Sequence, residues 1–202
     1  MRLEANGEGR QPDAPRRLRS LCVFCGSAAG HPPQFAEAAR ATGALLAQRG
    51  VALVYGGGHV GLMGALADAA LAGGARVTGV IPQPLMRPEV AHLGLTELIV
   101  VESMHQRKKL MADRSDAFLV LPGGYGTMDE TFEMVTWLQL GLQHKPIAAV
   151  NVGGYFDGLV RWIHHSVDTG FVRPAQANLL MVEPTPEAAL ARLEQSLARP
   201  IR

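Results

Sequence analysis

The sequence predicts an α/β fold in which a doubly wound, mostly parallel sheet is flanked by helices. From Leu18 onward, short apolar runs alternate with longer segments of helical periodicity, a pattern typical of parallel strands joined by crossover helices. The apolar runs are continuous rather than alternating, as in strands covered on both faces. The 202 residues suit one domain of ordinary size. We therefore expect one Rossmann-like domain over residues 18–202, after a disordered tail of residues 1–17.

Thirteen elements follow from this pattern. Seven apolar runs are expected to be strands, over residues 18–27, 51–58, 76–82, 97–103, 116–124, 145–152 and 178–184. Six segments with apolar residues at helical spacing are expected to be helices, over residues 32–50, 61–75, 104–115, 127–143, 155–170 and 185–198. Gly50 supplies a C-terminal stop signal for the first helix. The proline-containing residues 83–96 are expected to form a connection.

Composition excludes several classes of function. The formal net charge of +1 provides no strong field for nucleic acid or for an anionic membrane. Aromatic residues make up 5%, which leaves few platforms for base stacking. No apolar run reaches the length of about 18 residues that a spanning helix needs. The tail mixes both charge signs without an apolar segment, so it does not resemble a secretory signal, and we expect a cytoplasmic protein.

The cysteines and histidines do not indicate a metal site. Cys22 and Cys25 have C-x-x-C spacing but lie along an apolar strand, whereas a redox pair belongs at a helix N-terminus, where the thiol pKa is lowered. We interpret them as small buried residues, with a redox pair as the alternative. His59, His92 and His105 are scattered, without metal-ligand spacing. No metal or cofactor is expected.

Ligands of doubly wound sheets bind beyond the carboxyl ends of the strands. The residues that follow the expected strands are Ser27 and the runs 56–58, 82–89, 102–107 and 123–130. The run "GGGHVGLMG" contains G-x-G-x-x-G, but the next strand ends in Ile81 and Pro82 and lacks the acid that an NAD ribose requires. Gly57 and Gly58 therefore form a tight turn or one wall of a smaller nucleotide site.

The run "PGGYGT" is a stronger signal. Gly123, Gly124 and Gly126 let successive N–H groups converge, and Thr127 adds a hydroxyl at a helix start. Together with the helix dipole, this arrangement predicts a phosphate cradle. No lysine follows as in a Walker motif, so a single phosphate fits better than a triphosphate with magnesium.

Glu130 has two interpretations. Thr127-x-x-Glu130 fits a capping box, in which the glutamate bonds the N–H of the cap residue. Asp129, however, already favours the helix N-terminus electrostatically, and the first turn of this helix faces the expected crevice. A carboxylate beside a bound ribose would have chemistry to perform there.

The run "MHQRKK" places cations at a helix start, which the helix dipole disfavours. One explanation is a solvated face. The other is that Arg107 and Lys108, with Met104 beside them, point at an anionic ligand in the crevice.

The pair "MHQRK" and "PGGYGTMDE" resembles the LOG (Lonely guy) family of cytokinin riboside 5′-monophosphate phosphoribohydrolases, whose sequences are often labelled lysine decarboxylases. The resemblance extends from Leu18 over the rest of the chain and includes "FCGS", "LVYGGGHVGLMG", "GVIP" and "WLQLGLQHKPI". It implies cleavage of the N-glycosidic bond of an adenosine-type 5′-monophosphate, giving free base and ribose 5-phosphate.

The resemblance also implies the site residues. Its catalytic pair corresponds to Arg107 and Glu130. Its substrate-binding positions correspond to Glu89, Lys108, Gly123, Gly124, Tyr125, Gly126, Thr127, Met128, Asp129 and Thr136. Many relatives have glutamate where this chain has Asp129. An oxocarbenium-like ribose would be stabilised by the Glu130 carboxylate, which could instead orient the attacking water. Arg107 would bind either phosphate or the departing base, and the base could be adenine or an N6-modified adenine.

Two alternatives come from other classes. A pyridoxal phosphate-dependent decarboxylase needs a Schiff-base lysine, but Lys108, Lys109 and Lys145 are the only lysines in the chain and lack an obvious pyridinium partner. A non-catalytic nucleoside-monophosphate sensor would leave Arg107 and Glu130 without a task.

A homodimer is expected from the helix over residues 127–143. Its apolar residues cannot all fit one arc of about 100° facing the sheet. They are Phe132, Met134, Val135, Trp137, Leu138, Leu140 and Leu142. The family resemblance also implies dimers in which one subunit approaches the pocket of the other. The alternative is a monomer whose last helix covers this surface.

Overall fold

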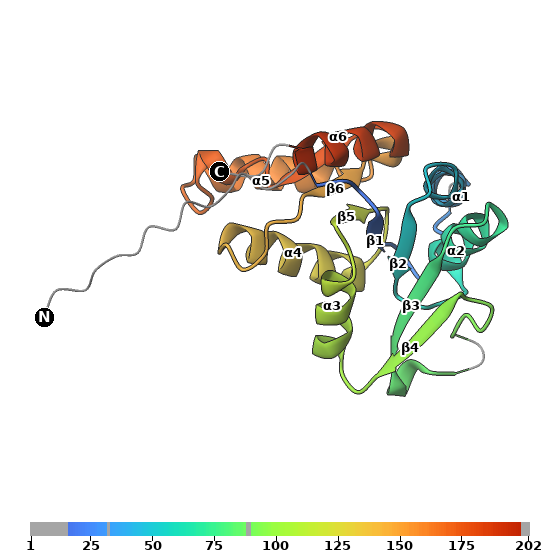
Figure 1. The fold of residues 1–202 in the computed structure, drawn as a ribbon. Coiled ribbons are helices and arrows are strands. Elements are labelled where there is room, and N and C mark those ends of the chain that lie inside the picture. The colour runs from blue at the N-terminus through green and yellow to red at the C-terminus, as the bar shows by residue number, and fades with distance from the viewer. Residues whose placement is uncertain (1–15, 32, 88–89, 199–202) are drawn as a thin grey trace, which may run out of the picture.

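The computed structural model describes residues 16–31, 33–87 and 90–198. Within them, seven parallel strands form one sheet in the order β4-β3-β2-β1-β5-β6-β7. The fold class is therefore confirmed, and the sheet is parallel throughout (Figure 1). Of the expected tail, only Arg16 and Arg17 lie within the described residues.

All the expected strands and helices are present. The strands are β1 (Ser20–Phe24), β2 (Ala52–Tyr55), β3 (Val77–Pro82), β4 (Glu97–Val101), β5 (Ala117–Val120), β6 (Ile147–Val150) and β7 (Leu180–Glu183). The helices are α1 (Gln34–Gln48), α2 (Gly61–Ala72), α3 (Met104–Asp113), α4 (Tyr125–Gln139), α5 (Asp157–Asp168) and α6 (Pro186–Ala198), with short 3₁₀ turns at Gln83–Leu85, Val152–Gly154 and Pro174–Gln176.

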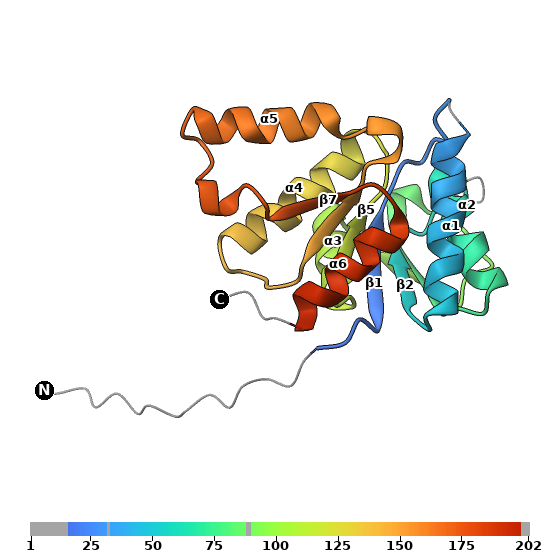
Figure 2. The same cartoon turned by 90° about the horizontal axis from the view of Figure 1, so that it is seen from above.

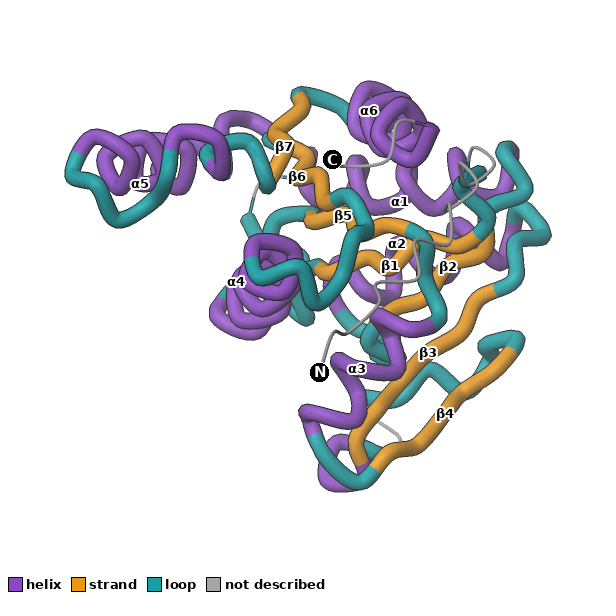
Figure 3. Tube along the Cα trace, turned by 60° about the vertical axis from the view of Figure 1, so that its left-hand side comes forward, coloured by secondary structure: helices purple, strands orange, loops and turns teal. Residues whose placement is uncertain are grey.

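Helices cover both faces of the sheet, as Figures 2 and 3 show. α1, α2 and α6 pack on one face and share a core with the side chains of Leu21, Leu53 and Leu119. α3, α4 and α5 lie over the other face, where Phe24 and Phe118 stack with ring centroids 5.8 Å apart. α5 extends beyond the sheet, and Ser166 is its one buried residue.

β3, β5 and β6 are completely buried, and β1 and β2 are buried except for their first residue, as their continuous apolar character predicts. β4 at one edge is different, because its five residues are only partly buried or exposed. The expectation that every strand is covered on both faces is therefore wrong for β4, and three of the four residues of β7 at the other edge are also only half-buried. An edge strand has a neighbour on one side only, and here no helix covers it fully.

The central strand β1 separates two halves of the sheet. The chain winds outward from β1 to β4, returns through α3 to place β5 on the other side of β1, and then winds outward again to β7. Ligands of such sheets bind where the winding direction reverses, here between the carboxyl ends of β1 and β5. Within the described residues, no helix combines the length and apolarity that crossing a membrane requires.

Candidate active site

The ends of β1 and β5 lie side by side at the reversal point. The N–H of Leu121 donates to the carbonyl of Phe24 at 2.9 Å, and the N–H of Gly26 donates to the carbonyl of Pro122 at 3.0 Å. These bonds bring the loop that begins at Ser27 against the loop that begins at Gly123. A cavity of about 280 Å³ opens between the two loops. The crevice expected from the strand order is therefore present.

The glycine-rich loop leads directly into α4. Gly124 is the N-cap residue in an extended conformation (φ −92°, ψ −151°), and its carbonyl accepts the first helical bond from Met128 at 3.1 Å. The preceding N–H groups of the first turn have no partner within a helix. A Cβ on Gly123 would lie 2.1 Å from the Thr127 hydroxyl oxygen, so only glycine fits there. This turn therefore has the form of an anion cradle.

The position of Gly124 corrects the expected start of the helix. α4 begins at Tyr125, two residues before the expected start at Thr127, and its N-cap residue makes no side-chain capping bond. Thr127 lies inside the first turn, where its side chain is buried. The capping-box interpretation of Thr127 and Glu130 is therefore wrong. The reason is that the flexible glycine backbone bends at Gly124 and lets the helix start early.

Glu130 pairs with Arg107 instead. An Arg107 nitrogen lies 3.1 Å from a Glu130 carboxylate oxygen, and both side chains are almost completely buried. The same guanidinium donates to the carbonyl of Val80 at 2.9 Å and to the carbonyl of Gly56 at 3.2 Å. A Cβ on Gly56 would lie 2.1 Å from the guanidinium, so this glycine of the G-x-G-x-x-G run makes room for Arg107.

The electrostatics of Glu130 reflect its burial. Removal from water raises the pKa of the Glu130 carboxyl, and the charge of Arg107 opposes this rise without cancelling it. The neighbouring carboxylates of Asp129 and Glu133 raise the pKa further. A perturbed buried carboxyl at the reversal point of the sheet is typical of a functional group.

A second cluster of ion pairs lies beside the first and joins Lys108 of α3 to two acids of α4. The Lys108 ammonium lies 3.1 Å from Asp129 and 2.8 Å from Glu133, two acids one turn apart on α4. Burial alone would lower the pKa of Lys108, but its ion pairs with Glu133 and Asp129 raise it. Lys109, by contrast, is 65% exposed and pairs with Asp113 of its own helix. The solvated-face interpretation therefore holds for Lys109 and is wrong for Arg107 and Lys108.

The other expected site residues differ in their burial and in their distance from the Arg107–Glu130 pair. Ser27, Tyr125 and Gly126 are exposed beside the crevice, and Gly57 and Gly58 are buried in the turn after β2. Met104 is partly exposed, and its sulfur lies 3.9 Å from a nitrogen of Arg107. Met128 is half-buried and packs against the core under α4. Glu89 lies outside the described residues.

Thr136 does not share the face of Glu130. It is exposed on α4, whereas Glu130 is buried. Six residues at about 100° each leave the two side chains about 120° apart around the helix, so Thr136 and Glu130 point to different sides of α4. Within one chain, the structure does not bring Thr136 to the ion pair.

Two contacts of the site were not anticipated. Glu133 pairs with Lys108, and the spacing of Asp129 and Glu133 at i and i+4 is a signal that could have revealed it. The hydroxyl of Tyr155 donates to the carbonyl of Gly123 at 2.6 Å. Tyr155 follows β6, so extending the strand-end rule to that strand would have included it.

The cysteines are structural. Cys22 and Cys25 are buried free thiols, and burial raises the pKa of both. A redox thiol needs a lowered pKa, so the redox alternative is not supported.

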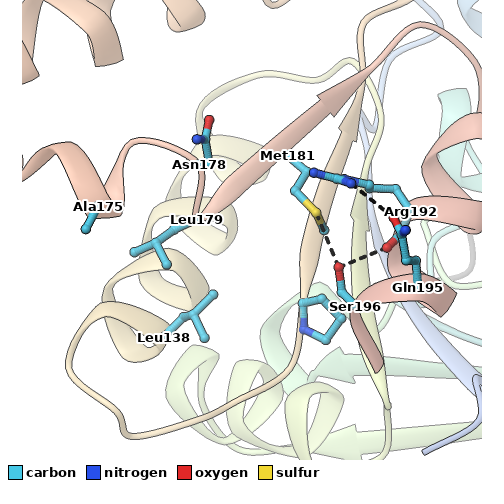
Figure 4. Close-up of a pocket in the computed structure, with 9 residues that line it drawn as sticks. Leu138, Ala175, Asn178, Leu179, Met181, Arg192, Gln195 and Ser196 are labelled. Carbon is cyan, nitrogen blue, oxygen red and sulfur yellow. Dashed lines mark hydrogen bonds between the residues drawn. The ribbon is translucent and has the colours of Figure 1, made fainter. Parts of the chain in front are cut away.

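A second cavity has a volume of about 310 Å³. Figure 4 shows the residues that line it. It is lined by the end of α4, the turn before β7, and α6, where the Ser196 hydroxyl donates to the carbonyl of Arg192 at 2.9 Å. None of the expected site residues lines it.

Comparison with known proteins points to one family. Residues 63–193 match the family described as "Possible lysine decarboxylase". A probable cytokinin riboside 5′-monophosphate phosphoribohydrolase of Oryza sativa subsp. japonica is 44% identical over 179 residues, which cover 89% of this chain and 85% of the relative. A cytokinin riboside 5′-monophosphate phosphoribohydrolase of Arabidopsis thaliana is 44% identical over 179 residues, covering 89% and 82%.

Solved structures share the fold. The molybdenum cofactor carrier protein of Chlamydomonas reinhardtii superposes with a TM-score of 0.68 at 22% identity, over 91% of this chain and all of that chain. The molybdenum cofactor binding protein of Rippkaea orientalis gives a TM-score of 0.67 at 18% identity, over 89% and 97%. At these identities the likeness concerns the fold alone.

Proposed function

This chain belongs to the LOG family of cytokinin riboside 5′-monophosphate phosphoribohydrolases, and we propose that it hydrolyses the N-glycosidic bond of an adenosine 5′-monophosphate, either plain or N6-modified. The products are the free base and ribose 5-phosphate. The observation that carries this proposal is the buried Arg107–Glu130 pair, one helical turn from the anion cradle. A phosphate in the cradle would bring the sugar of a nucleotide toward the carboxylate.

The cradle would hold the 5′-phosphate. The open N–H groups of the first turn of α4, between Gly124 and Thr127, supply donors and the positive end of the helix dipole. Phosphate is remote from the bond that breaks, so its binding energy serves to orient the ribose. The substrate is accordingly a small nucleotide rather than a nucleic acid or a membrane.

Glu130 would act on the ribose. Cleavage develops positive charge on the sugar, and a nearby carboxylate stabilises that charge or orients the attacking water. The water supplies a hydroxyl group to the anomeric carbon, and its other proton goes to the departing base. Arg107 fixes the carboxylate through their ion pair while the carbonyls of Val80 and Gly56 hold the guanidinium.

Catalysis is favoured over a non-catalytic sensor. The relatives are named as phosphoribohydrolases, and a sensor would have no use for a buried carboxylate with a raised pKa. A buried charge pair costs desolvation energy, which a binding protein could avoid.

The protein would assemble as a homodimer through α4 and α5. Phe132 and Trp162 form an edge contact with ring centroids 5.6 Å apart, yet both stay partly exposed, and Leu140 and Leu142 beyond them are more exposed. α6 packs with α1 on the opposite face of the sheet, so it does not cover this surface.

We also propose that the enzyme is cytoplasmic. The two free thiols support this location, because reducing compartments preserve free thiols.

The test is base release from a panel of 5′-monophosphates, followed by chromatography. We expect free base and ribose 5-phosphate in equal amounts, with turnover from AMP or its N6-isopentenyl form. Tight nucleotide binding without base release from any member of the panel would favour the sensor.

A further inference from the structure

A tyrosine outside the family motifs reaches the glycine-rich loop. The Tyr155 hydroxyl lies 2.6 Å from the carbonyl oxygen of Gly123. Tyr155 is 43% exposed, but its ring makes edge contacts with Phe35 and with Phe156, with ring centroids 5.5 Å and 5.0 Å apart. Tyr155 also lines the 280 Å³ cavity together with Gly123 and Gly124. Its hydroxyl is therefore directed at the loop by packing on two sides.

The position of Tyr155 is fixed by the turn after β6. The N–H of Asn151 donates to the carbonyl of Glu183 in β7 at 2.8 Å. The Asn151 side chain accepts the N–H of Phe156 at 2.7 Å and donates to Asp157 at 2.7 Å. This network ties the residue next to Tyr155 to the sheet. The hydroxyl thus approaches the loop from a rigid support.

The Gly123 carbonyl has a specific consequence for the cradle. A peptide unit is planar, and in the trans form its C=O and the following N–H point in opposite directions. The structure contains no cis peptide bond within the described residues. A bond that holds the Gly123 carbonyl toward Tyr155 therefore turns the N–H of Gly124 away from it. Gly124 is the N-cap residue of α4, so this N–H is one of the donors at the helix start that have no partner within the helix.

Without that bond, the peptide between the two glycines would be free to rotate. Neither residue has a side chain that restricts its backbone, and a Cβ on Gly124 would meet no atom within 4 Å. Rotation of the peptide would replace a donor with a carbonyl oxygen at the anion site. A phosphate would then meet a repulsive group in place of a hydrogen bond.

We propose that Tyr155 is a positioning residue that orients the Gly123–Gly124 peptide for phosphate binding. This proposal rests on the proposed function, because it concerns the 5′-phosphate of that substrate. Tyr155 acts through the loop and does not itself touch the reacting atoms. Its effect should therefore appear in substrate affinity rather than in the chemical step.

Tyr155→Phe tests the proposal, since it keeps the ring and its contacts and removes only the hydroxyl. We expect KM for AMP and the inhibition constant for inorganic phosphate both to rise about tenfold, the equivalent of about 1.4 kcal/mol. We expect kcat to stay within about twofold, and kcat/KM for the nucleoside adenosine, which lacks the phosphate, to be equally unaffected. Ser196→Ala is the matched control, because it also removes a hydroxyl that donates to a carbonyl, at 2.9 Å, but far from the loop.

The outcomes separate this proposal from the proposed function. Unchanged KM and phosphate inhibition in Tyr155→Phe would overturn the role of Tyr155. An equal loss of activity toward AMP and adenosine would also overturn it, because the effect would then be unrelated to phosphate. If the wild-type protein releases no base, the proposed hydrolysis fails. Calorimetric titration of both proteins with inorganic phosphate still decides whether Tyr155 orients the cradle.

Discussion

Arg107 of α3 and Glu130 of α4 are joined by an ion pair of 3.1 Å, with side-chain exposures of only 11% and 9%. The two residues lie on different helices of the same face, and each is the other's charged partner. Carbonyls of Val80 and Gly56 hold the guanidinium from the side of the sheet. The pair is thus a rigid unit, and replacing either member tests whether that unit performs chemistry.

Glu130→Gln should reduce base release from AMP at least about a hundredfold, because the amide keeps the size of the side chain but removes the charge. The folded structure should remain, since the amide has nearly the same shape as the carboxylate and can occupy the same place beside Arg107. Circular dichroism and chromatographic turnover measure the two effects. Glu187→Gln, an exposed acid in the first turn of α6, should leave turnover unchanged. Full activity in Glu130→Gln would disprove the catalytic role.

Arg107→Ala should also be inactive, whereas Lys109→Ala should be nearly normal. The first change leaves Glu130 buried without its partner, and breaking a buried pair typically costs about 3–5 kcal/mol, less where the carboxyl can take up a proton. The second removes an exposed pair with Asp113, worth about 0.3–0.5 kcal/mol. Turnover and thermal melting should be compared side by side. Equal and mild effects of the two substitutions would contradict a catalytic role for Arg107 and would indicate that it is an ordinary solvated cation.

Nucleoside 5′-monophosphates should be preferred over nucleosides by orders of magnitude in kcat/KM. The phosphate would bind the open N–H groups at the start of α4 and orient the ribose. Steady-state assays with AMP and adenosine measure the ratio. Comparable cleavage of the two would contradict a phosphate cradle between Gly123 and Thr127.

The acid limb of the pH profile should report Glu130. Burial raises the pKa of this carboxyl, so kcat/KM should fall at a higher pH than an ordinary glutamate would give, as the required carboxylate takes up a proton. Glu133→Gln removes a negative charge that raises this pKa, and should move the limb to lower pH. Glu194 pairs with Arg49 and does not contribute to the pKa of Glu130, so Glu194→Gln should not move the limb. A limb that stays in place in Glu133→Gln would contradict the assignment to Glu130.

Light scattering at micromolar concentration should give twice the single-chain mass of 21.6 kDa. Trp162→Glu should shift the protein toward the monomer, because it places a charge on the apolar surface of α4 and α5. Leu93→Glu changes another exposed apolar residue, outside that surface, and should preserve the dimer. A wild-type mass near that of one chain would refute the homodimer.

The succession of strands and helices along the chain could be predicted because each strand is a short apolar run and each helix has apolar residues at helical spacing. The early start of α4 could not, because it depends on the backbone conformation that Gly124 adopts in the folded loop. α4 also ends at Gln139, four residues before the expected end at residue 143, because helix ends depend on local contacts. The partial exposure of β4 followed from its place at the edge, which no local pattern encodes.

The candidate site shows the same division. Arg107 and Glu130 stand out in short motifs that resemble those of the LOG family, so the sequence predicts both as candidate site residues. Their ion pair, and the contact of Tyr155 with Gly123, join residues that are 23 and 32 positions apart. Such contacts arise from the winding of the sheet. The spacing of residues in one segment does not reveal them.

The central place of β1 has a consequence for how the protein folds. Leu21 pairs with Ala117, and the carboxylate of Asp116 accepts a hydrogen bond from the N–H of Ser20 at 2.9 Å. One edge of β1 therefore pairs with a strand that lies almost a hundred residues later in the chain. Until β5 is synthesised, that edge of β1 is unpaired and open to association with other chains. Pairing over such a separation is slow because the loop must first close. We therefore expect enzymatic activity to return late in refolding, after the two halves of the sheet have joined.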